Sequence, residues 1–269
     1  MRFMVNKSIA LLFTFLLVFS GTLYAKENSD WEELNNYTGT IADNLKIGMT
    51  LVMTGKDVSG VYFYNKWLQD IPISGSMKDN RSIVLNEYDQ NGQIKGMFKG
   101  HFLEHASEFG NQKTPLKYEV IEGVWSHPDG VDSKPFRLVM DNATYRPIGS
   151  GRYYVAGFNN DKDVEVFAQN VWKAIIDTNK EKLASMVAYP INVHIGRKNV
   201  KVKNKSSFIQ NYDQIFYKDF YEKVKRSIPH NMFVRDMGVM LGDGEIWIGL
   251  RDKGIYVVAI NNAKNKGNG

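Results

Sequence analysis

The sequence predicts an α+β fold: an N-terminal antiparallel β meander that curls towards a barrel, followed by a part in which helices precede strands. Three observations lead to this prediction. Short strand-like segments separated by turn residues occupy the first half. Helical periodicity begins only after about residue 160. Between the two halves, residues 146–160 are rich in turn-forming residues, which is typical of a connection between folding units.

The first 25 residues have the pattern of a secretory signal peptide. Arg2 and Lys7 precede an apolar run from Ile9 to Phe19, and small residues then lead to Ala25. We therefore expect cleavage after Ala25 and a periplasmic protein. An uncleaved membrane anchor is the alternative, but the apolar run is short for a spanning helix of roughly 17–25 residues. After cleavage the chain is not expected to span the membrane.

Composition excludes several kinds of chemistry. The 269 residues contain no cysteine, so the chain forms no disulfide and has no thiol nucleophile and no thiolate metal ligand. Cleavage would remove two of its basic residues and lower the formal net charge from +5 to +3. This weak excess does not indicate nucleic-acid binding, and an exported protein has no ordinary access to nucleic acid. We expect neither a nucleic-acid partner nor a cofactor.

Residues 26–38 are polar and are predicted to form a leader, with the β-rich, barrel-like domain at 39–145. A Gly-x-aromatic triplet recurs there, as in Gly96-Met97-Phe98 and Gly123-Val124-Trp125. Glycine inside a strand often marks a bend, and an aromatic ring can cover the gap. We therefore expect the meander to curve into a barrel. The expected strands are Met49–Met53, Val61–Tyr64, Ile71–Ser74, Ile83–Tyr88, Ile94–Leu103, Tyr118–Trp125 and Phe136–Met140.

Residues 146–160 are predicted to be a linker containing one candidate strand, Tyr153–Ala156. The second domain, 161–262, is predicted to begin with a helix, because apolar residues from Val164 to Ile176 recur at helical spacing. Thr178 and Glu181 have the spacing of a capping box for a second helix. A tail, 263–269, ends the chain. The later elements expected are a helix at Asn179–Ala188, a hairpin at Ile191–Ile195 and Asn199–Val202, helices near Phe208–Phe216 and Phe220–Ile228, and strands at Asp236–Leu241, Glu245–Leu250 and Gly254–Asn261.

Three stretches carry a resemblance to a known fold: Tyr189-Pro190, Phe208 with the run Tyr212 to Phe216, and the run Gly238 to Trp247 (GVMLGDGEIW). On these residues the C-terminal part resembles the NTF2-like (SnoaL-like) fold of exported bacterial proteins, a cone of curved antiparallel sheet over helices. The N-terminal half is similar in style to lipocalin-like barrels. In NTF2-like enzymes an acid, histidine or tyrosine of the pocket does acid–base work. The resemblance implies these pocket candidates: Tyr189, His194, Tyr212, Asp213, Asp236 and Trp247.

Each pocket candidate also has a structural interpretation. Tyr212 and Trp247 have positions typical of core aromatics, and Asp213 of a surface charge. The sequence has no P-loop, no nucleophile elbow and no acid partnered with histidine at a diagnostic spacing. His101 and His105 would stand about 13 Å apart on a strand, too far to bind one metal. The catalytic residues stay unknown, no metal site is predicted, and an enzyme is less expected than a binding protein.

A basic run offers a second kind of site. Alternation places Lys201, Lys203 and Lys205 on one face of a strand, with Val200 and Val202 on the other. A solvated, aggregation-resistant edge is one interpretation. A docking surface for an acidic envelope protein or an anionic envelope polymer is the other. The partner-binding candidates are Arg197, Lys198, Lys201, Lys203 and Lys205, and a further binding face is expected at Tyr62, Tyr64 and Trp67.

These observations favour a non-catalytic periplasmic binding protein, such as an inhibitor or immunity-type partner of another envelope protein. The alternative is an NTF2-like isomerase, cyclase or hydrolase acting on a small molecule in the C-terminal pocket. A structural envelope protein is a third possibility. A deep cavity with convergent polar groups would favour the enzyme, whereas a filled interior with an exposed basic patch would favour partner binding.

Overall fold

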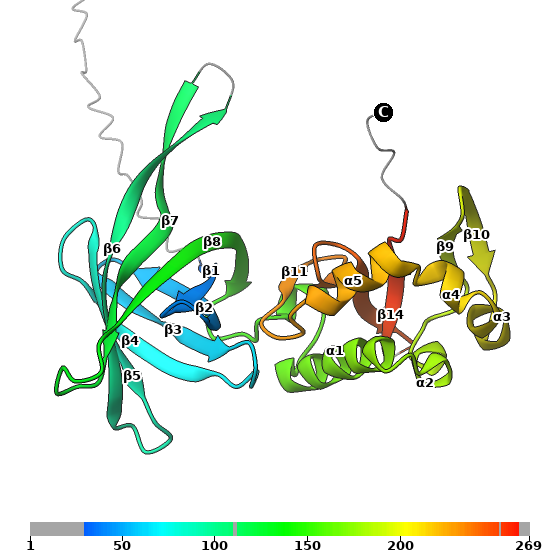
Figure 1. Cartoon of the computed structure of the whole chain (residues 1–269), viewed down its shortest axis with the longest axis horizontal. Coiled ribbons are helices and arrows are strands. Elements are labelled where there is room, and N and C mark those ends of the chain that lie inside the picture. Colours follow the sequence, from blue (N-terminus) through cyan, green and yellow to red (C-terminus); the bar gives the residue numbers. More distant parts are fainter. Residues whose placement is uncertain (1–29, 110–111, 253, 264–269) are drawn as a thin grey trace, which may run out of the picture.

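The computed structural model describes residues 30–109, 112–252 and 254–263, and for residues 104–119 only the backbone. It consists of a β-barrel and an α+β part that lie side by side (Figure 1). The expected signal peptide, the first residues of the expected leader and the last residues of the expected tail lie outside the described residues, as does the side chain of His105.

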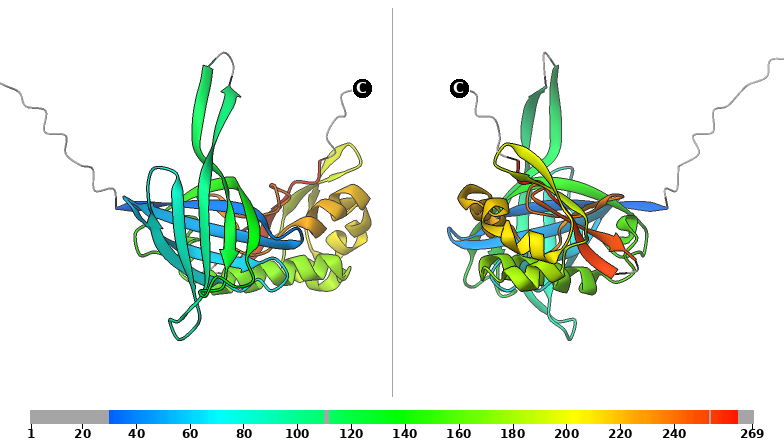
Figure 2. Two further views of the ribbon diagram at one scale, coloured as in Figure 1. Left: turned by 60° about the vertical axis from the view of Figure 1, so that its left-hand side comes forward. Right: turned by 90° about the vertical axis from the view of Figure 1, so that its right-hand side faces the viewer.

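Eight antiparallel strands form a closed N-terminal barrel, which confirms the predicted barrel-like architecture. The barrel closes because β1 pairs with β2 on one side and with β8 on the other. Strands β6 and β7 project beyond the rest of the barrel (Figures 1 and 2). The strands are β1 (Trp31–Ile41), β2 (Leu45–Thr54), β3 (Asp57–Tyr64), β4 (Ile71–Met77), β5 (Ser82–Tyr88), β6 (Ile94–Phe109), β7 (Gln112–Ser126) and β8 (Lys134–Pro147).

The predicted leader is wrong for residues 31–38, because they belong to β1. Leu34 and Tyr37 are buried, as expected for a strand of a barrel wall. The strand is hard to recognise from its sequence because Asn36, which is also buried, faces polar groups of the C-terminal part rather than water. The domain therefore begins before Gly39 and continues to Pro147.

Apolar side chains fill the inside of the barrel. Tyr37, Met49, Phe98 and Leu138 belong to one buried cluster there. Tyr62, a residue predicted for an exposed binding face, is also buried, and its hydroxyl donates to Glu87 Oε2 at 2.8 Å. Of the three aromatics predicted for that face, Tyr64 is partly buried and only Trp67 is largely exposed.

Two glycines show how the Gly-x-aromatic triplets contribute to the wall. A Cβ at Gly96 would lie 2.7 Å from Trp125 Nε1, so the missing side chain makes room for the indole ring. A Cβ at Gly123 would lie 2.1 Å from the carbonyl oxygen of Lys99 on the neighbouring strand. These contacts support the expectation that glycine permits close approach within a curved sheet.

We expect Gly123→Ala to lower the free energy of unfolding by about 1–3 kcal/mol, because the added methyl group collides with backbone that cannot rotate away. Urea denaturation followed by tryptophan fluorescence measures the change. Val124→Ala is the matched control, since Val124 is 44% exposed and should change stability by no more than about 0.5 kcal/mol. Equal effects of the two substitutions would contradict the steric explanation.

The C-terminal part contains helices, a two-stranded hairpin and a four-stranded antiparallel sheet in the order β11-β12-β13-β14. Its core includes Val171 of the first helix and Phe208, Tyr212 and Phe216, which fill the space between the helices and the sheet. Its elements are η1 (Tyr154–Ala156), α1 (Asp161–Ile176), α2 (Lys180–Ser185), β9 (Ile191–Ile195), β10 (Lys198–Val202), α3 (Lys205–Gln210), α4 (Tyr212–Ile215), α5 (Lys218–Arg226), β11 (Phe233–Arg235), β12 (Gly238–Leu241), β13 (Ile246–Arg251) and β14 (Gly254–Ile260).

Three local predictions for this part are wrong. The candidate strand in the linker is the 3₁₀ turn η1, whose backbone groups bond to one another rather than to a neighbouring strand. Asn179, not Thr178, caps α2: its side chain accepts from Lys182 N, while Thr178 has a φ of +54°. Lys203 and Lys205 do not continue the strand face, because β10 ends at Val202 and Asn204 caps α3, which begins at Lys205.

Among the described residues, no helix is both long enough and apolar enough to cross a membrane.

Candidate functional site

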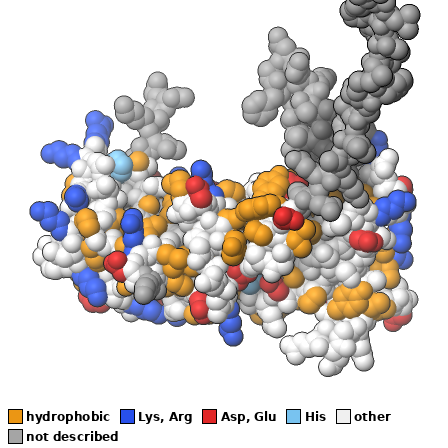
Figure 3. Space-filling model, turned by 180° about the vertical axis from the view of Figure 1, so that it is seen from behind, with side chains coloured by type: hydrophobic (Ala, Val, Ile, Leu, Met, Phe, Trp, Pro, Cys, Tyr) orange, Lys and Arg blue, Asp and Glu red, His pale blue; other side chains and the backbone are white. Residues whose placement is uncertain are grey.

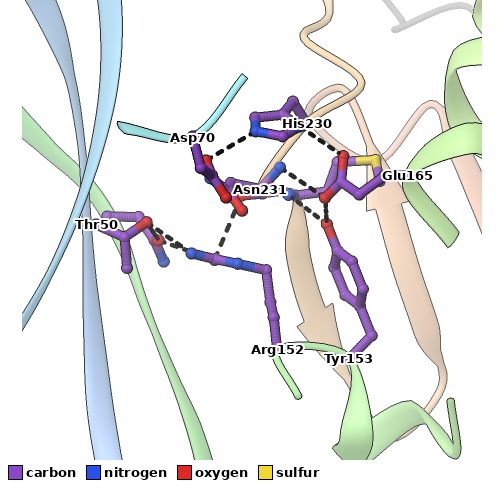
Figure 4. Close-up of polar contacts among 9 residues, drawn as sticks. Thr50, Asp70, Arg152, Tyr153, Glu165, His230 and Asn231 are labelled. Atoms are coloured by element: carbon purple, nitrogen blue, oxygen red, sulfur yellow. Dashed lines mark hydrogen bonds and ion pairs between the residues drawn. The ribbon is translucent and has the colours of Figure 1, made fainter. Parts of the chain in front are cut away.

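The two parts of the molecule meet at a buried polar cluster centred on Arg152. This residue lies just after β8, within the predicted linker, yet it is only 6% exposed. Its guanidinium donates to Thr50 Oγ1 at 2.6 Å and to Asn36 Oδ1 at 3.0 Å, both on the outer wall of the barrel (Figure 4). A bond of 3.4 Å to the carbonyl oxygen of Asn231 reaches the C-terminal part. The segment predicted as a linker therefore contributes Arg152 to the junction between the two parts.

His230 forms the second bridge between the two parts. Its Nε2 lies 2.9 Å from Oδ1 of Asp70, in the loop between β3 and β4. Its Nδ1 lies 2.9 Å from Oε2 of Glu165 on α1, an ion pair without the alignment of a hydrogen bond. The imidazole is 9% exposed and packs edge-on against Phe63, with ring centroids 4.5 Å apart. Figure 4 shows the ring between its two carboxylates.

The two carboxylates determine the charge of His230. Burial alone would lower the pKa of the imidazole, but Asp70 and Glu165 outweigh burial and raise this pKa to about 9. The pKa of Asp70 is lowered: burial acts to raise it, but the bonds from His230 and Asn231 prevail. At neutral pH the histidine is therefore an imidazolium held between two carboxylates.

Glu165 is held in place by further donors. Its Oε1 accepts the hydroxyl of Tyr153 and, at 2.9 Å, the backbone N–H of Asn231. The Tyr153 hydroxyl in turn accepts the backbone N–H of Met232 at 3.0 Å. Burial and the neighbouring carboxylate raise the pKa of Tyr153 well above its usual range, so it stays a neutral donor.

This arrangement is unsuited to acid–base catalysis by His230. A general base needs a ring nitrogen free to take a proton from a substrate. Here each ring nitrogen faces a carboxylate at 2.9 Å, and the charged ring joins the barrel to the C-terminal part. No set of three histidine or carboxylate side chains in the described part of the chain is arranged to hold a metal ion. The polar cluster is a structural junction.

The junction separates two clefts. The larger, of about 690 Å³, lies between the outer wall of the barrel and α1, and we call it the interdomain cleft. A smaller cleft of about 470 Å³ lies on the other side, where His230 and Asn231 again form part of the wall. The interdomain cleft is lined by residues that include Leu34, Val61, Arg146, Lys162, Glu165 and His230.

The structure does not bring the predicted pocket residues together. The buried Tyr212 hydroxyl donates to the Ile175 carbonyl at 3.5 Å, and the Tyr189 hydroxyl donates to the Ala184 carbonyl at 2.9 Å. Both tyrosines are thus core aromatics with a satisfied polar end, and burial raises the pKa of Tyr212 to about 12.

The acidic candidates lie on the surface. The Asp213 side chain is 78% exposed and pairs with Lys180, and that of Asp236 is 84% exposed and lies beside Arg235. His194 lies on β9, where its backbone groups bond to the side chain of Asn262. The interior in which such residues would have met is filled by the core of this part.

Trp247, by contrast, lines a cavity. This cavity, about 640 Å³, lies beside β12 and β13 and also contains Lys223, Arg226 and Glu245. Glu245 is 8% exposed, and its Oε2 accepts the backbone N–H of Asp243 at 2.6 Å. Lys223 Nζ lies 4.0 Å from the same carboxylate.

The basic residues predicted for partner binding lie on and beside the β9–β10 hairpin, and all are exposed. Val202 is buried and Lys201 exposed, so the alternation predicted for β10 is confirmed over its last residues. The stretch from Ile191 to Tyr212 contains no aspartate or glutamate. Basic side chains lie along the left edge of Figure 3, at the end of the C-terminal part away from the barrel. We call Arg197, Lys198, Lys201, Lys203 and Lys205 the basic hairpin surface.

The chain thus combines an antiparallel eight-stranded barrel with an α+β part, and the two are joined by a junction in which the His230 imidazole lies between two carboxylates. No family model matches the chain, and no curated protein matches it in sequence.

The sequence alone does not predict the junction. Asp70, Arg152, Glu165 and His230 are far apart in the chain and form no motif. The sequence places His230 directly after Pro229, at the end of a predicted helix, which marks the position as a helix end. The two partners of His230, Asp70 and Glu165, are recognisable only in the folded chain.

Proposed function

We propose that this chain is an exported, non-catalytic binding protein whose basic hairpin surface docks on an acidic face of another envelope protein, as an inhibitor or immunity-type partner does. The single observation that carries the proposal is the basic hairpin surface itself. Its five cations lie within nine residues, are all exposed, and have no ion-pair partner among the described side chains.

Two further observations support binding rather than catalysis. The barrel interior and the space between the C-terminal helices and sheet are both filled by apolar cores. His230, whose pKa is raised to about 9 by Asp70 and Glu165, has a carboxylate beside each of its ring nitrogens. Unpaired surface cations favour association with an acidic partner, because complementary charges accelerate encounter and disfavour wrong partners.

We also propose that residues 161–262 form an NTF2-like cone. A four-stranded antiparallel sheet follows a series of helices there, and Phe208, Tyr212 and Phe216 of the resembling stretches are core residues. Export through residues 1–25 and cleavage after Ala25 belong to the same proposal, supported by the sequence pattern.

Reversing the charge of two hairpin residues, Lys198→Glu with Lys201→Glu, should weaken capture of the envelope partner at least tenfold. The immobilised protein is exposed to an envelope fraction, and the retained protein is quantified at about 0.05 M and about 0.5 M salt, where screening differs strongly. Lys56→Glu with Lys99→Glu is the matched control, since both lysines are exposed on the barrel and the charge change is the same.

Equal retention by the hairpin variant and the barrel variant would contradict the proposal. Retention of an acidic polysaccharide in place of protein, lost only in the hairpin variant, would assign the surface to an anionic envelope polymer instead.

A second candidate function, an enzyme acting on a small molecule, is favoured by the cavity beside Trp247. There a buried carboxylate, Glu245, lies next to Lys223 and an aromatic ring, which is a suitable environment for a polar substrate. Turnover that is lost in Glu245→Gln and kept in the hairpin variant would establish this function over the binding proposal.

A further inference from the structure

Apolar side chains line both walls of the interdomain cleft. On the barrel side they include Val52 and Val61, which are partly exposed, and on the opposite side Val166 of α1 faces the same space. Val166 is 47% exposed. An apolar surface within a concave cleft is a typical place for the aliphatic part of a ligand.

The polar groups of the cleft are not equally available. Glu32 accepts Arg146 Nε at 2.7 Å, and Asp161 accepts the backbone N–H groups of Arg152 and Tyr153. Asp70 and Glu165 are taken by the junction. Every carboxylate that lines the cleft therefore already has a donor.

The side chains of the cleft that can still form hydrogen bonds to a ligand are donors. The Lys162 ammonium has no partner among the described side chains, and neither does the Gln169 amide, about two turns further along α1. Arg146 uses Nε for Glu32 and keeps the rest of its guanidinium. A group that binds here must accept hydrogen bonds, and two cations favour one with negative charge.

Direct contacts join the two walls of the cleft. The junction ties the barrel to α1 through Asp70, His230 and Glu165, and Arg152, which also lines the cleft, donates to Thr50 on the barrel wall. A site that is formed before the ligand enters loses less entropy on binding than one that must be ordered. The volume of about 690 Å³ is within the range of small-molecule sites.

We infer that the interdomain cleft binds a single-chain aliphatic anion, with its head group at Lys162 and Arg146 and its chain along Val61 and Val166. This site is separate from the basic hairpin surface, and its occupancy does not depend on the proposed docking of a protein partner.

Isothermal titration with decanoate, below the concentration at which it forms micelles, tests the inference. We expect saturable binding at one site, with acetate and decanol both at least tenfold weaker because each lacks one of the two features. Lys162→Gln should weaken decanoate binding about tenfold through loss of a charge-assisted bond, and Val166→Asp should abolish it. A parallel titration with decyl phosphate identifies the preferred head group.

Lys173→Gln is the matched control, because Lys173 lies on the same helix, is exposed and pairs with Asp177 away from the cleft. It should bind decanoate as the unaltered protein does, and so should the hairpin variant Lys198→Glu with Lys201→Glu. Absence of saturable binding of either amphiphile, or equal affinities of Lys162→Gln and Lys173→Gln, would overturn the inference. Failure of partner capture with intact decanoate binding would reject only the docking function.

Discussion

Replacing Arg152 by alanine is expected to lower the free energy of unfolding by about 3–5 kcal/mol, because it removes one partner of a buried charged network. Arg152 and His230 balance the charges of Asp70 and Glu165 across the junction. Without the guanidinium a single imidazolium faces the two carboxylates of Asp70 and Glu165, so the junction carries a net negative charge. Thr50 Oγ1 also loses the donor it has from Arg152, and Asn36 Oδ1 keeps only the bond from the Thr50 hydroxyl. Burial of both groups makes this loss costly.

Chemical denaturation followed by tryptophan fluorescence measures this effect. Arg152→Met is the second variant: it restores much of the side-chain volume but supplies neither charge nor donors, so we expect most of the loss to persist. Arg137→Ala is the matched control, because Arg137 pairs with Glu122 on the surface and is 49% exposed, and its removal should cost less than about 1 kcal/mol. A loss below about 1 kcal/mol for both Arg152 variants would show that the junction does not stabilise the fold.

Stability should fall as the pH rises from about 6.5 to about 9, by about 2–3 kcal/mol, because of His230. The pKa of this imidazole is about 9 in the folded protein and 6.5 in a free side chain. The folded chain thus holds its proton more tightly than the unfolded chain. The stabilisation is fully present below pH 6.5 and is lost as the pH rises through 9, when a neutral ring no longer balances its two carboxylates.

The difference between the unaltered protein and His230→Gln isolates this effect. Denaturation midpoints of the two proteins are compared at intervals from about pH 6 to about pH 10, a range that brackets both pKa values of the imidazole, and we expect the variant to lose most of the slope. His127→Gln, on the barrel, should keep it. Asp70 gives the opposite pH dependence in the acidic range. Because its pKa is lowered in the folded state, its contribution to stability is present above pH 3.8 and is lost as the pH falls further. A slope unchanged by His230→Gln would refute the assignment.

The barrel is predictable because its information is local. Alternation along β5 and β8 and the turn residues between strands indicate a meander, and Gly96 and Gly123 indicate where it curves. The helix α1 is equally clear, since Val164 to Ile176 follow one helical face. In both cases one side of the element faces a core, so apolar residues recur along the sequence at the spacing of a strand or a helix.

β1 and the supposed linker cannot be predicted in the same way. The outer side of β1 is buried against a second domain, so Asn36 occupies a core-like position with a polar side chain. Arg152 looks like a loop residue in the sequence but is almost fully buried. Polar residues at an interface between two parts give a pattern that is indistinguishable from a solvated segment.

The elements with one apolar face, the lack of thiol chemistry and the concentration of positive charge near residue 200 all follow from the amino-acid sequence. Which polar residues meet depends on how the elements pack. Asp70, Arg152, Glu165 and His230 come from separate elements, and the docking of the two parts brings them within bonding distance and places the interdomain cleft beside them. Periodicity reports burial along one element, whereas a charge-balanced junction depends on distances between elements, which no local sequence pattern contains.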